Sequence, residues 1–184
     1  MLAARPGLVI IDRDGVINEN SDEYIKSVAE WRPIAGSLEA IAALYRAGWR
    51  VAVVTNQSGV GRGLYDEETL AAIHGHMRER VRAAGGDLAG IYYCPHLPDA
   101  GCDCRKPRPG MFRQLERELG LSVRGVPYIG DRISDVQAAE AVGAHAMLVR
   151  TGTGALTERD LGDNAVPVYA DLWAAARALL DESK

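Results

Sequence analysis

Short apolar runs alternate with longer amphipathic stretches along the whole chain. The short runs lack a regular polar–apolar alternation, which is typical of strands buried on both faces of a sheet. We therefore predict strands at residues 8–11, 51–54, 91–93, 126–129, 146–149 and 166–169. The amphipathic stretches between them have the period of helices that bury one face.

Each amphipathic stretch begins at a residue that can start a helix. Ser, Asp and Pro are all favoured at or near the first turn, and these residues are Ser37, Asp66, Pro109, Ser134 and Asp171. Glycines end four of the predicted helices near residues 47, 84, 119 and 143. The strand–helix alternation predicts an α/β fold, a doubly wound parallel sheet with helices on both faces.

Length and charge narrow the class of protein. The 184 residues, 47% apolar and 25% charged, fit a single globular domain over residues 1–184. The net charge of −4 argues against a broad nucleic-acid surface. No apolar run reaches 18 residues, so we expect no membrane span. Asp12 ends the first apolar run too early for a signal peptide, so we expect a cytoplasmic protein.

Polar side chains follow successive predicted strands, where parallel sheets bind their ligands. Asp12 and Asp14 follow the first strand, and Gly15 permits the turn that would aim both carboxylates at one pocket. One carboxylate could attack an electrophile while the other moves a proton. The alternative is that Asp14 and Gly15 form a simple turn and Asp12 a cap.

A second acidic pair follows the fourth strand. Asp131 and Asp12 would make an all-oxygen site that suits Mg²⁺. Asp135 either favours the positive end of a helix dipole or supports the metal ligand Asp131.

Two further loops carry groups suited to phosphate. Thr55 and the residues to Gly59 offer a hydroxyl and backbone N–H groups that can cradle a phosphoryl group. Lys106, one of only three lysines, lies between Arg105 and Pro107. Its compact charge would neutralise a carboxylate nucleophile and a phosphate together.

All three cysteines lie within one loop. Cys94 and His96, then Cys102 and Cys104, form two closely spaced pairs. Four ligands of type Cys₃His satisfy tetrahedral Zn²⁺ with no open position, so we predict a structural site. The alternative is three clustered reduced thiols. The other histidines, at positions 74, 76 and 145, show no ligand spacing.

The order Asp-x-Asp, Thr, Lys and Gly-Asp-x-x-x-Asp after successive strands resembles the haloacid dehalogenase superfamily of phosphotransferases. The resemblance implies that Asp12 becomes an aspartyl phosphate and that Asp14 is the general acid and base. Asp14 would also lend its backbone carbonyl to Mg²⁺, and Asp131 would complete the Mg²⁺ site. Thr55 and Lys106 would hold the transferred phosphoryl group.

The cysteine loop joined to Arg105-Lys106-Pro107, with the motifs at 12–18 and 55–59, looks like the D-glycero-D-manno-heptose 1,7-bisphosphate 7-phosphatases. Histidinol-phosphate phosphatases are close relatives. Members often carry a second histidine where this chain has Leu97, which leaves His96 as the ligand. The resemblance implies removal of the C7 phosphate of a phosphorylated sugar in activated-heptose synthesis, which supplies cell-surface glycans such as lipopolysaccharide.

The spacing between motifs leaves no room for a separate cap domain, so specificity must come from the loops at residues 18–31 and 57–64 and from the cysteine loop. We expect the substrate at Asn18, Asn20, Ser21, Asp22, Glu23, Asn56, Gln57, Ser58, Arg105 and Arg132. The capless resemblance also implies a monomer. Two other classes stay open at this point: a phospho-accepting receiver domain, and a zinc-stabilised binding module without catalysis. The preferred anomer of the sugar is left open.

Overall fold

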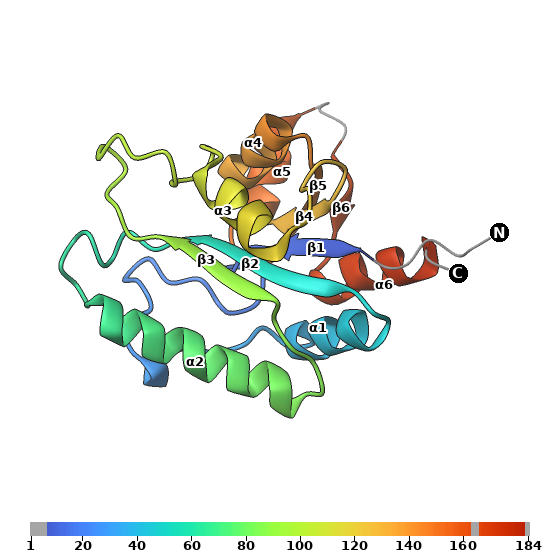
Figure 1. Ribbon diagram of the computed structural model, residues 1–184, viewed down its shortest axis with the longest axis horizontal. Helices are drawn as coiled ribbons and strands as arrows, with labels where there is room; N and C mark the ends of the chain where they lie inside the picture. Colours follow the sequence, from blue (N-terminus) through green and yellow to red (C-terminus); the bar gives the residue numbers. More distant parts are fainter. Residues whose placement is uncertain (1–6, 163–165, 183–184) are drawn as a thin grey trace.

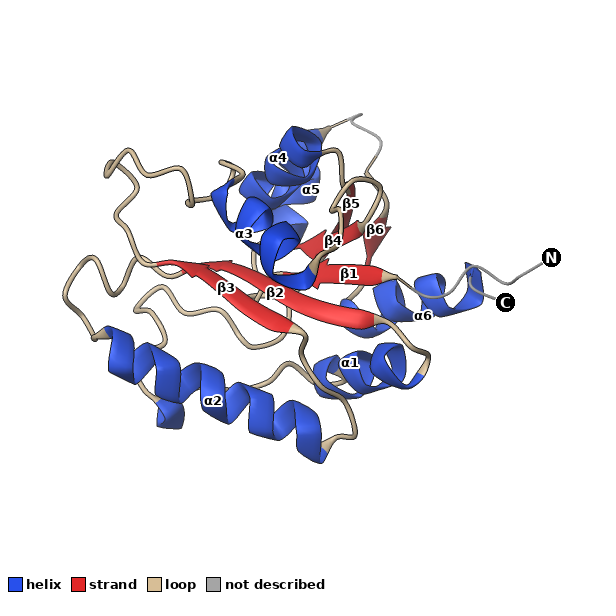
Figure 2. Cartoon of the chain, viewed as in Figure 1, coloured by secondary structure: helices blue, strands red, loops and turns tan. Residues whose placement is uncertain are grey.

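A parallel sheet separates two layers of helices in the computed structural model, which describes residues 7–162 and 166–182 (Figures 1 and 2). The strands are β1 (Leu8–Ile11), β2 (Arg50–Asn56), β3 (Gly90–Cys94), β4 (Pro127–Gly130), β5 (His145–Val149) and β6 (Val168–Tyr169). The helices are the 3-10 turn η1 (Val28–Glu30), α1 (Ser37–Arg46), α2 (Glu67–Ala83), α3 (Gly110–Leu119), α4 (Ile133–Val142), α5 (Gly154–Leu161) and α6 (Leu172–Glu182). None of these helices is long and apolar enough to cross a membrane.

The strand order is β3-β2-β1-β4-β5-β6, and every pairing is parallel. The order reverses between β1 and β4, and such reversals leave a crevice at the carboxyl ends of the strands. Receiver domains of the flavodoxin-like type have the order 2-1-3-4-5 instead. The expectation of a parallel doubly wound sheet is confirmed, and the receiver-domain alternative is wrong.

The first strand is apolar throughout because both faces of the sheet are covered. Val9 and Ile11 of β1 pack in one apolar cluster with α1, α2 and α6. Leu8 and Ile10 pack in a second cluster with α3 and α4 on the opposite face. Figure 1 shows these two helical layers below and above the sheet.

Three of the predicted helix starts are confirmed. Asp66 and Asp171 each accept a hydrogen bond of 2.8 Å from the backbone N–H three residues later. Pro109 is the residue that precedes the first turn of α3.

The predictions for Ser37 and Ser134 are wrong. Gly36, with φ of 81°, is the N-cap residue that precedes α1, and the Ser37 hydroxyl instead donates 2.6 Å to the Ile17 carbonyl. α4 begins after Arg132, whose backbone N–H donates 3.0 Å to the Asp135 carboxylate. The Ser37 hydroxyl is engaged in a tertiary contact, and at the start of α4 the Asp135 carboxylate accepts the hydrogen bond in place of the Ser134 hydroxyl.

Two differences lie near the C-terminus. α5 was not predicted, because it buries only Gly154, Thr157 and Leu161 and follows a Thr-Gly-Thr run that is typical of loops. β6 covers only two residues of the predicted strand at 166–169. Neither difference moves the carboxyl ends of β1, β2 and β4, where the polar residues gather.

Candidate active site

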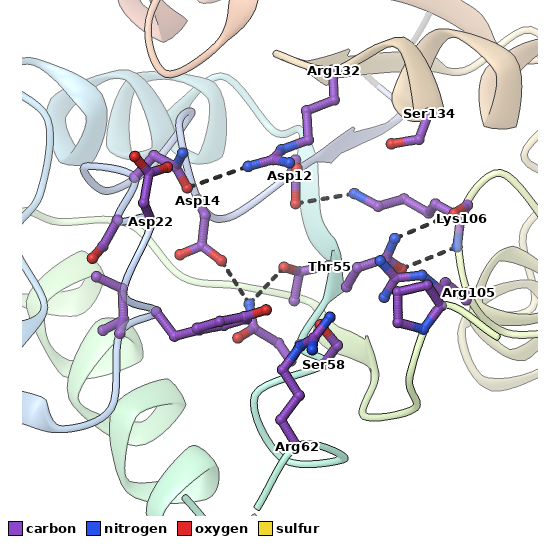
Figure 3. A pocket seen from close by; sticks show the side chains of 17 residues that line it. Asp12, Asp14, Asp22, Thr55, Ser58, Arg62, Arg105, Lys106, Arg132 and Ser134 are labelled. Atoms are coloured by element: carbon purple, nitrogen blue, oxygen red, sulfur yellow. Dashed lines mark hydrogen bonds and ion pairs between the residues drawn. The ribbon is translucent and has the colours of Figure 1, made fainter. Parts of the chain in front are cut away.

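A cavity of about 350 Å³ opens at the carboxyl ends of the central strands. Figure 3 shows side chains from the segment after β1, from β2 and from the loop before α3 converging on it. The predicted residues that line it are Asp12, Asp14, Asn20, Ser21, Asp22, Thr55, Asn56, Gln57, Ser58, Arg105, Lys106 and Arg132. Its lining also includes Tyr24, Ile25, Arg62, Pro98 and Ser134, which sequence reasoning missed.

Two predicted substrate-binding residues do not line this cavity. Asn18 is fully buried, and its Nδ2 donates 2.9 Å to Asp14 Oδ1. Glu23 is exposed on the Asn20–Ile25 loop, where its backbone N–H donates to the Ser21 hydroxyl. Asn18 thus holds a site residue, and the polar loop composition gave no signal to separate it from Asn20 or Ser21.

Asp12 lies at the end of β1 with only 4% of its surface exposed. Its backbone N–H donates 2.9 Å to the Ile129 carbonyl of β4, which fixes the chain at the point where the sheet reverses. Oδ1 accepts from the Arg13 backbone at 2.7 Å and lies 3.1 Å from Lys106 Nζ. Burial raises the pKa of Asp12 to about 7 although Lys106 opposes the shift, and the nearby acids Asp135 and Asp131 add to it.

Lys106 is buried among oxygen atoms. Besides Asp12, its Nζ contacts the Val54 carbonyl at 3.0 Å, the Tyr128 hydroxyl at 2.9 Å and Asp135 Oδ1 at 2.7 Å. Burial alone would lower its pKa, but the carboxylates of Asp12 and Asp135 raise it, so the ammonium stays charged.

Asn56 fixes the backbone at Lys106. Its Oδ1 accepts 3.0 Å from the Lys106 N–H, and its Nδ2 donates 3.3 Å to the Lys106 carbonyl. A side chain at the end of β2 therefore holds a loop that arrives 50 positions later in the chain. The sequence prediction gave Asn56 only a substrate contact, and the structure adds this anchoring contact.

Asp12, Asp131 and Asp135 place carboxylate oxygens within 4.8 Å of one another. Asp131 is fully buried, and its Oδ2 accepts 2.8 Å from the backbone N–H of Thr153 and 3.0 Å from its hydroxyl. Its Oδ1 is a buried oxygen without a hydrogen-bond partner. Burial and the neighbouring Asp135 raise the pKa of Asp131 to about 6. A cation would satisfy the unpaired oxygen and neutralise these acids.

Glycines leave room for the Asp131 carboxylate. A Cβ on Gly15 or on Gly152 would lie 2.3 Å from Asp131 Oδ2. Both residues also have positive φ, at 82° and 60°. The turn at Gly15 predicted from sequence therefore also leaves space for the Asp131 carboxylate.

Asp135 uses both of its oxygens within the protein. Oδ1 accepts 2.7 Å from the Tyr128 hydroxyl and pairs with Lys106, and Oδ2 accepts from the backbone of Asp131 and Arg132. Asp135 therefore accepts hydrogen bonds at the start of α4 and from the backbone of Asp131, and its support of a metal ligand stays a prediction.

Asp14 is held by side chains on two sides. Its Oδ1 accepts from Asn18 and from two nitrogens of Arg13, and its Oδ2 accepts 2.7 Å from Gln57 Nε2. Burial would raise the pKa of Asp14, but the Arg13 guanidinium and these hydrogen bonds outweigh it and lower the pKa. Gln57 Nε2 also donates 2.9 Å to Thr55 Oγ1. The acid is thus tied to the hydroxyl that faces the same cavity (Figure 3).

The loop between β3 and α3 brings the three cysteines and His96 together (yellow-green in Figure 1). Cys94 Sγ lies 3.2 Å from Cys104 Sγ and 3.6 Å from Cys102 Sγ. His96 Nδ1 lies 3.2 Å from Cys104 Sγ and 3.6 Å from Cys94 Sγ. All four ligand atoms lie within 4.8 Å of one another and could hold a metal ion. Cys104 directly precedes Arg105 and Lys106, so this cluster shapes the loop that delivers them.

Comparisons with known proteins agree with this geometry. A family model described as HAD-hydrolase-like matches residues 103–175. The chain is 51% identical over 173 residues to the D-glycero-β-D-manno-heptose-1,7-bisphosphate 7-phosphatase of Pseudomonas aeruginosa, covering 94% of this chain and 97% of that protein.

Two solved structures are also similar. The D,D-heptose 1,7-bisphosphate phosphatase of Bordetella bronchiseptica, complexed with magnesium and phosphate, has a TM-score of 0.91 at 47% identity, covering 95% of this chain and 98% of that one. The corresponding enzyme of Burkholderia thailandensis has a TM-score of 0.74 at 37% identity, covering 94% and 97%. The chain belongs to the D-glycero-β-D-manno-heptose-1,7-bisphosphate 7-phosphatase family of HAD-like hydrolases.

Proposed function

We propose that this protein is a phosphatase that removes the C7 phosphate of D-glycero-D-manno-heptose 1,7-bisphosphate through an aspartyl phosphate. The observation that carries the proposal is the buried Asp12 carboxylate, which lines a polar cavity and lies 3.1 Å from Lys106. The activity of the relatives and the magnesium and phosphate of the similar structure support it.

The chemistry divides between Asp12 and Asp14. A carboxylate oxygen of Asp12 attacks phosphorus, and the bond between phosphorus and the C7 oxygen breaks. Asp14 donates a proton to that departing oxygen and then removes a proton from the water that attacks the aspartyl phosphate, releasing phosphate and Asp12. Asp14 is held ionised without substrate, and the negative charge of an arriving phosphate raises its pKa so that it can carry the proton. Thr55 and Lys106 hold the phosphoryl oxygens.

Magnesium fits the cluster of Asp12, Asp131 and Asp135, of which Asp12 lines the cavity. Asp12, Asp131 and the backbone carbonyl of Asp14 would hold it, and the unpaired Asp131 Oδ1 is suited to a cation. When bound, the ion supplies neutralisation of the negative charge shared by phosphate and nucleophile. Asp135 holds Lys106 Nζ at 2.7 Å.

Zinc fits the cysteine cluster. Bonds of about 2.3 Å to a tetrahedral zinc place sulfur ligands roughly 3.8 Å apart, and Cys94 lies 3.2 and 3.6 Å from the other two sulfurs. Cys94, His96, Cys102 and Cys104 would fill all four positions, so the ion is structural. It holds the loop that carries Arg105 and Lys106.

Selectivity for a bisphosphate comes from the rim of the cavity. Arg62, Arg105 and Arg132 all line it. Arg132 donates 3.4 Å to Asn20 Oδ1, and the Arg62 guanidinium lies over the Tyr24 ring at 5.8 Å. These side chains supply positive charge for a phosphate that does not react. We propose that loops alone close this site, without a cap domain.

We further propose a monomer with one domain. One sheet organises the described residues, and the large exposed apolar side chains among them lie on separate elements or loops. They are Val28, Tyr45, Leu64, Ile133, Leu156 and Trp173. Such scattered side chains are normal at a monomer surface.

The decisive experiment measures phosphate release from heptose 1,7-bisphosphate and from histidinol phosphate side by side with Mg²⁺. We expect a higher kcat/KM for the heptose bisphosphate and release of far more than one equivalent of phosphate per chain. A higher kcat/KM for histidinol phosphate would identify that compound as the substrate instead. A single equivalent would mean that the protein accepts a phosphoryl group without turnover, and no release would leave a zinc-stabilised binding module.

A further inference from the structure

Arg13 is a fully buried arginine next to both catalytic acids, and it does not line the cavity. Its Nε and one terminal nitrogen contact Asp14 Oδ1 at 3.0 and 2.9 Å, and the same terminal nitrogen lies 3.2 Å from Asp14 Oδ2. The guanidinium therefore grips the carboxylate as a fork. How well the fork holds Asp14 depends on what holds the other end of the guanidinium.

His74 occupies that other end. The remaining terminal nitrogen of Arg13 lies 3.2 Å from His74 Nε2, a contact between residues 61 positions apart. Arginine can only donate, so Nε2 is the acceptor and the ring proton resides on Nδ1. Burial, followed by the positive charge of Arg13, lowers the pKa of His74 to about 3, with Arg78 acting in the same direction and Asp14 opposing.

The ring of His74 is itself held in place. The residue lies on α2, 7% exposed, and its ring packs at 5.7 Å against the Tyr93 ring of β3. Helix α2 and strand β3 thus fix the position of His74 Nε2, which accepts from Arg13. Without that acceptor, a buried N–H of a charged group would lack a partner and the fork could rotate.

We propose that His74 is a positioning residue of the reaction: by accepting from Arg13 it fixes the guanidinium that aims the Asp14 carboxylate at the leaving oxygen. The inference rests on the proposed function, in which Asp14 donates the proton. A histidine that merely fills space under α2 would support folding but would leave the proton transfer unaffected. The two roles differ in how the protein responds to the leaving group.

The test compares two substrates of the same enzyme. The sugar alkoxide needs a proton as it leaves, whereas p-nitrophenolate is a stable anion and leaves without one. The variant His74→Met replaces the ring by an apolar side chain of similar length whose thioether accepts hydrogen bonds only weakly, and His74→Gln keeps a strong amide-oxygen acceptor. His76→Met is the matched control, because His76 lies on the same helix and packs on Trp31 instead. kcat/KM is measured for both substrates, because it reports the first phosphoryl transfer.

We expect His74→Met to lower kcat/KM for heptose bisphosphate by about 10- to 100-fold, part of the roughly 100-fold or more that a general acid supplies. The value for p-nitrophenyl phosphate should fall less than about threefold, because only the other substrate needs the acid. His74→Gln should recover most of the lost activity. His76→Met should leave the ratio of the two kcat/KM values unchanged.

If His74→Met leaves the ratio of the two kcat/KM values unchanged, whether both values fall or neither does, the positioning role is overturned. If His74→Met does not fold, as judged by circular dichroism, His74→Asn takes its place, because its acceptor is too short to reach Arg13. If the wild-type enzyme cleaves only another alkyl phosphate, such as histidinol phosphate, the proposed substrate fails. The same ratio measured on that alkyl phosphate then still decides the role of His74.

Discussion

Lys106 Nζ lies 3.1 Å from Asp12 Oδ1, and both side chains are almost completely buried. The lysine also contacts Asp135 and two neutral oxygens, so one ammonium group serves two carboxylates. A charge so confined contributes most when further negative charge enters the site, as it does when a phosphoryl group is transferred. This relationship explains why the loop before α3 must be held so firmly by Asn56.

Lys106→Ala should mainly lower kcat, by about 100-fold or more, because its charge stabilises the phosphoryl group during transfer. Steady-state kinetics on heptose bisphosphate measures the effect. Arg113→Ala is the control for the loss of one positive charge, since Arg113 is exposed on α3 and does not line the cavity. A Lys106→Ala enzyme with normal kcat and a raised KM would contradict this role.

Asp12→Asn should abolish turnover and leave the fold intact. The amide preserves shape and can still accept from the Arg13 backbone, but it removes the nucleophile and one magnesium ligand. Activity should fall below about one hundredth of the wild-type rate, because a lost nucleophile costs several powers of ten. Asp160→Asn, an exposed change on α5, serves as the control. Turnover above that level in a pure Asp12→Asn preparation would falsify the nucleophile assignment.

Metal analysis of the purified protein should find about one zinc ion per chain, by the closed four-ligand arrangement. Cys102→Ser should lower the zinc content and the melting temperature, because metal binding and folding of the ligand loop are coupled. Asp103→Asn, in the same loop but exposed, should change neither. A zinc-free protein whose Cys102→Ser variant melts like the wild type would rule out a structural ion.

The sequence predicted the architecture well because local pattern and global burial agree. Strand β1 is apolar at every position, and helices cover both of its faces. Asp12, Thr55 and Asp131 could be placed together because parallel strands end at one edge of a sheet. This rule needs no knowledge of individual contacts, so the sequence alone predicts that these residues share one site.

Contacts between distant segments were outside the reach of that reasoning. In the sequence, Arg13 is only the residue between two acids, and His74 shows no ligand spacing. In the structure the two side chains lie 3.2 Å apart although they are 61 positions apart in the chain. Ser37 looks like a helix cap until its hydroxyl finds the Ile17 carbonyl. Arg62 lies in the loop at residues 57–64, which the sequence places at the site, but the loop's composition does not single out this side chain. These side chains are defined by packing, which periodicity does not encode.

His74 should make stability depend on pH. Its pKa is about 3 in the folded protein, against an ordinary value of 6.5. Below pH 6.5 the unfolded chain gains a proton that the folded chain refuses, so stability is lost as the pH falls from 6.5 towards 3. The loss is about 1.4 kcal/mol per pH unit, or about 2 kcal/mol between pH 7 and 5.

Urea unfolding of the wild type and of His74→Gln at pH 7 and pH 5 measures this dependence. The glutamine variant should lose about 2 kcal/mol less than the wild type between those two pH values, because it has no group to titrate there. The other acids and the cysteine cluster are common to both proteins and cancel in the comparison. Parallel pH profiles would mean that His74 is protonated in the folded state.

Arg105 and Lys106 are neighbours in the chain, but their substitution should change different kinetic constants. Lys106 is buried against the nucleophile, whereas Arg105 lines the open part of the cavity with one weak contact of 3.5 Å to the His96 carbonyl. Its planar fork suits a part of the substrate that does not react. Arg105→Ala should therefore raise KM for heptose bisphosphate more than it lowers kcat, since lost uniform binding is expressed in KM.

The same change should narrow the preference for the bisphosphate over simple sugar monophosphates, because a monophosphate has no second phosphate for Arg105 to hold. Steady-state kinetics of the variant on both substrate types measures the preference as a ratio of kcat/KM values. Arg113→Ala, exposed on α3 and outside the cavity lining, is the matched control for loss of one positive charge. An unchanged ratio in Arg105→Ala would assign recognition of the second phosphate to the other rim arginines, Arg62 and Arg132. The zinc-held loop would then serve only to carry Lys106 to the nucleophile.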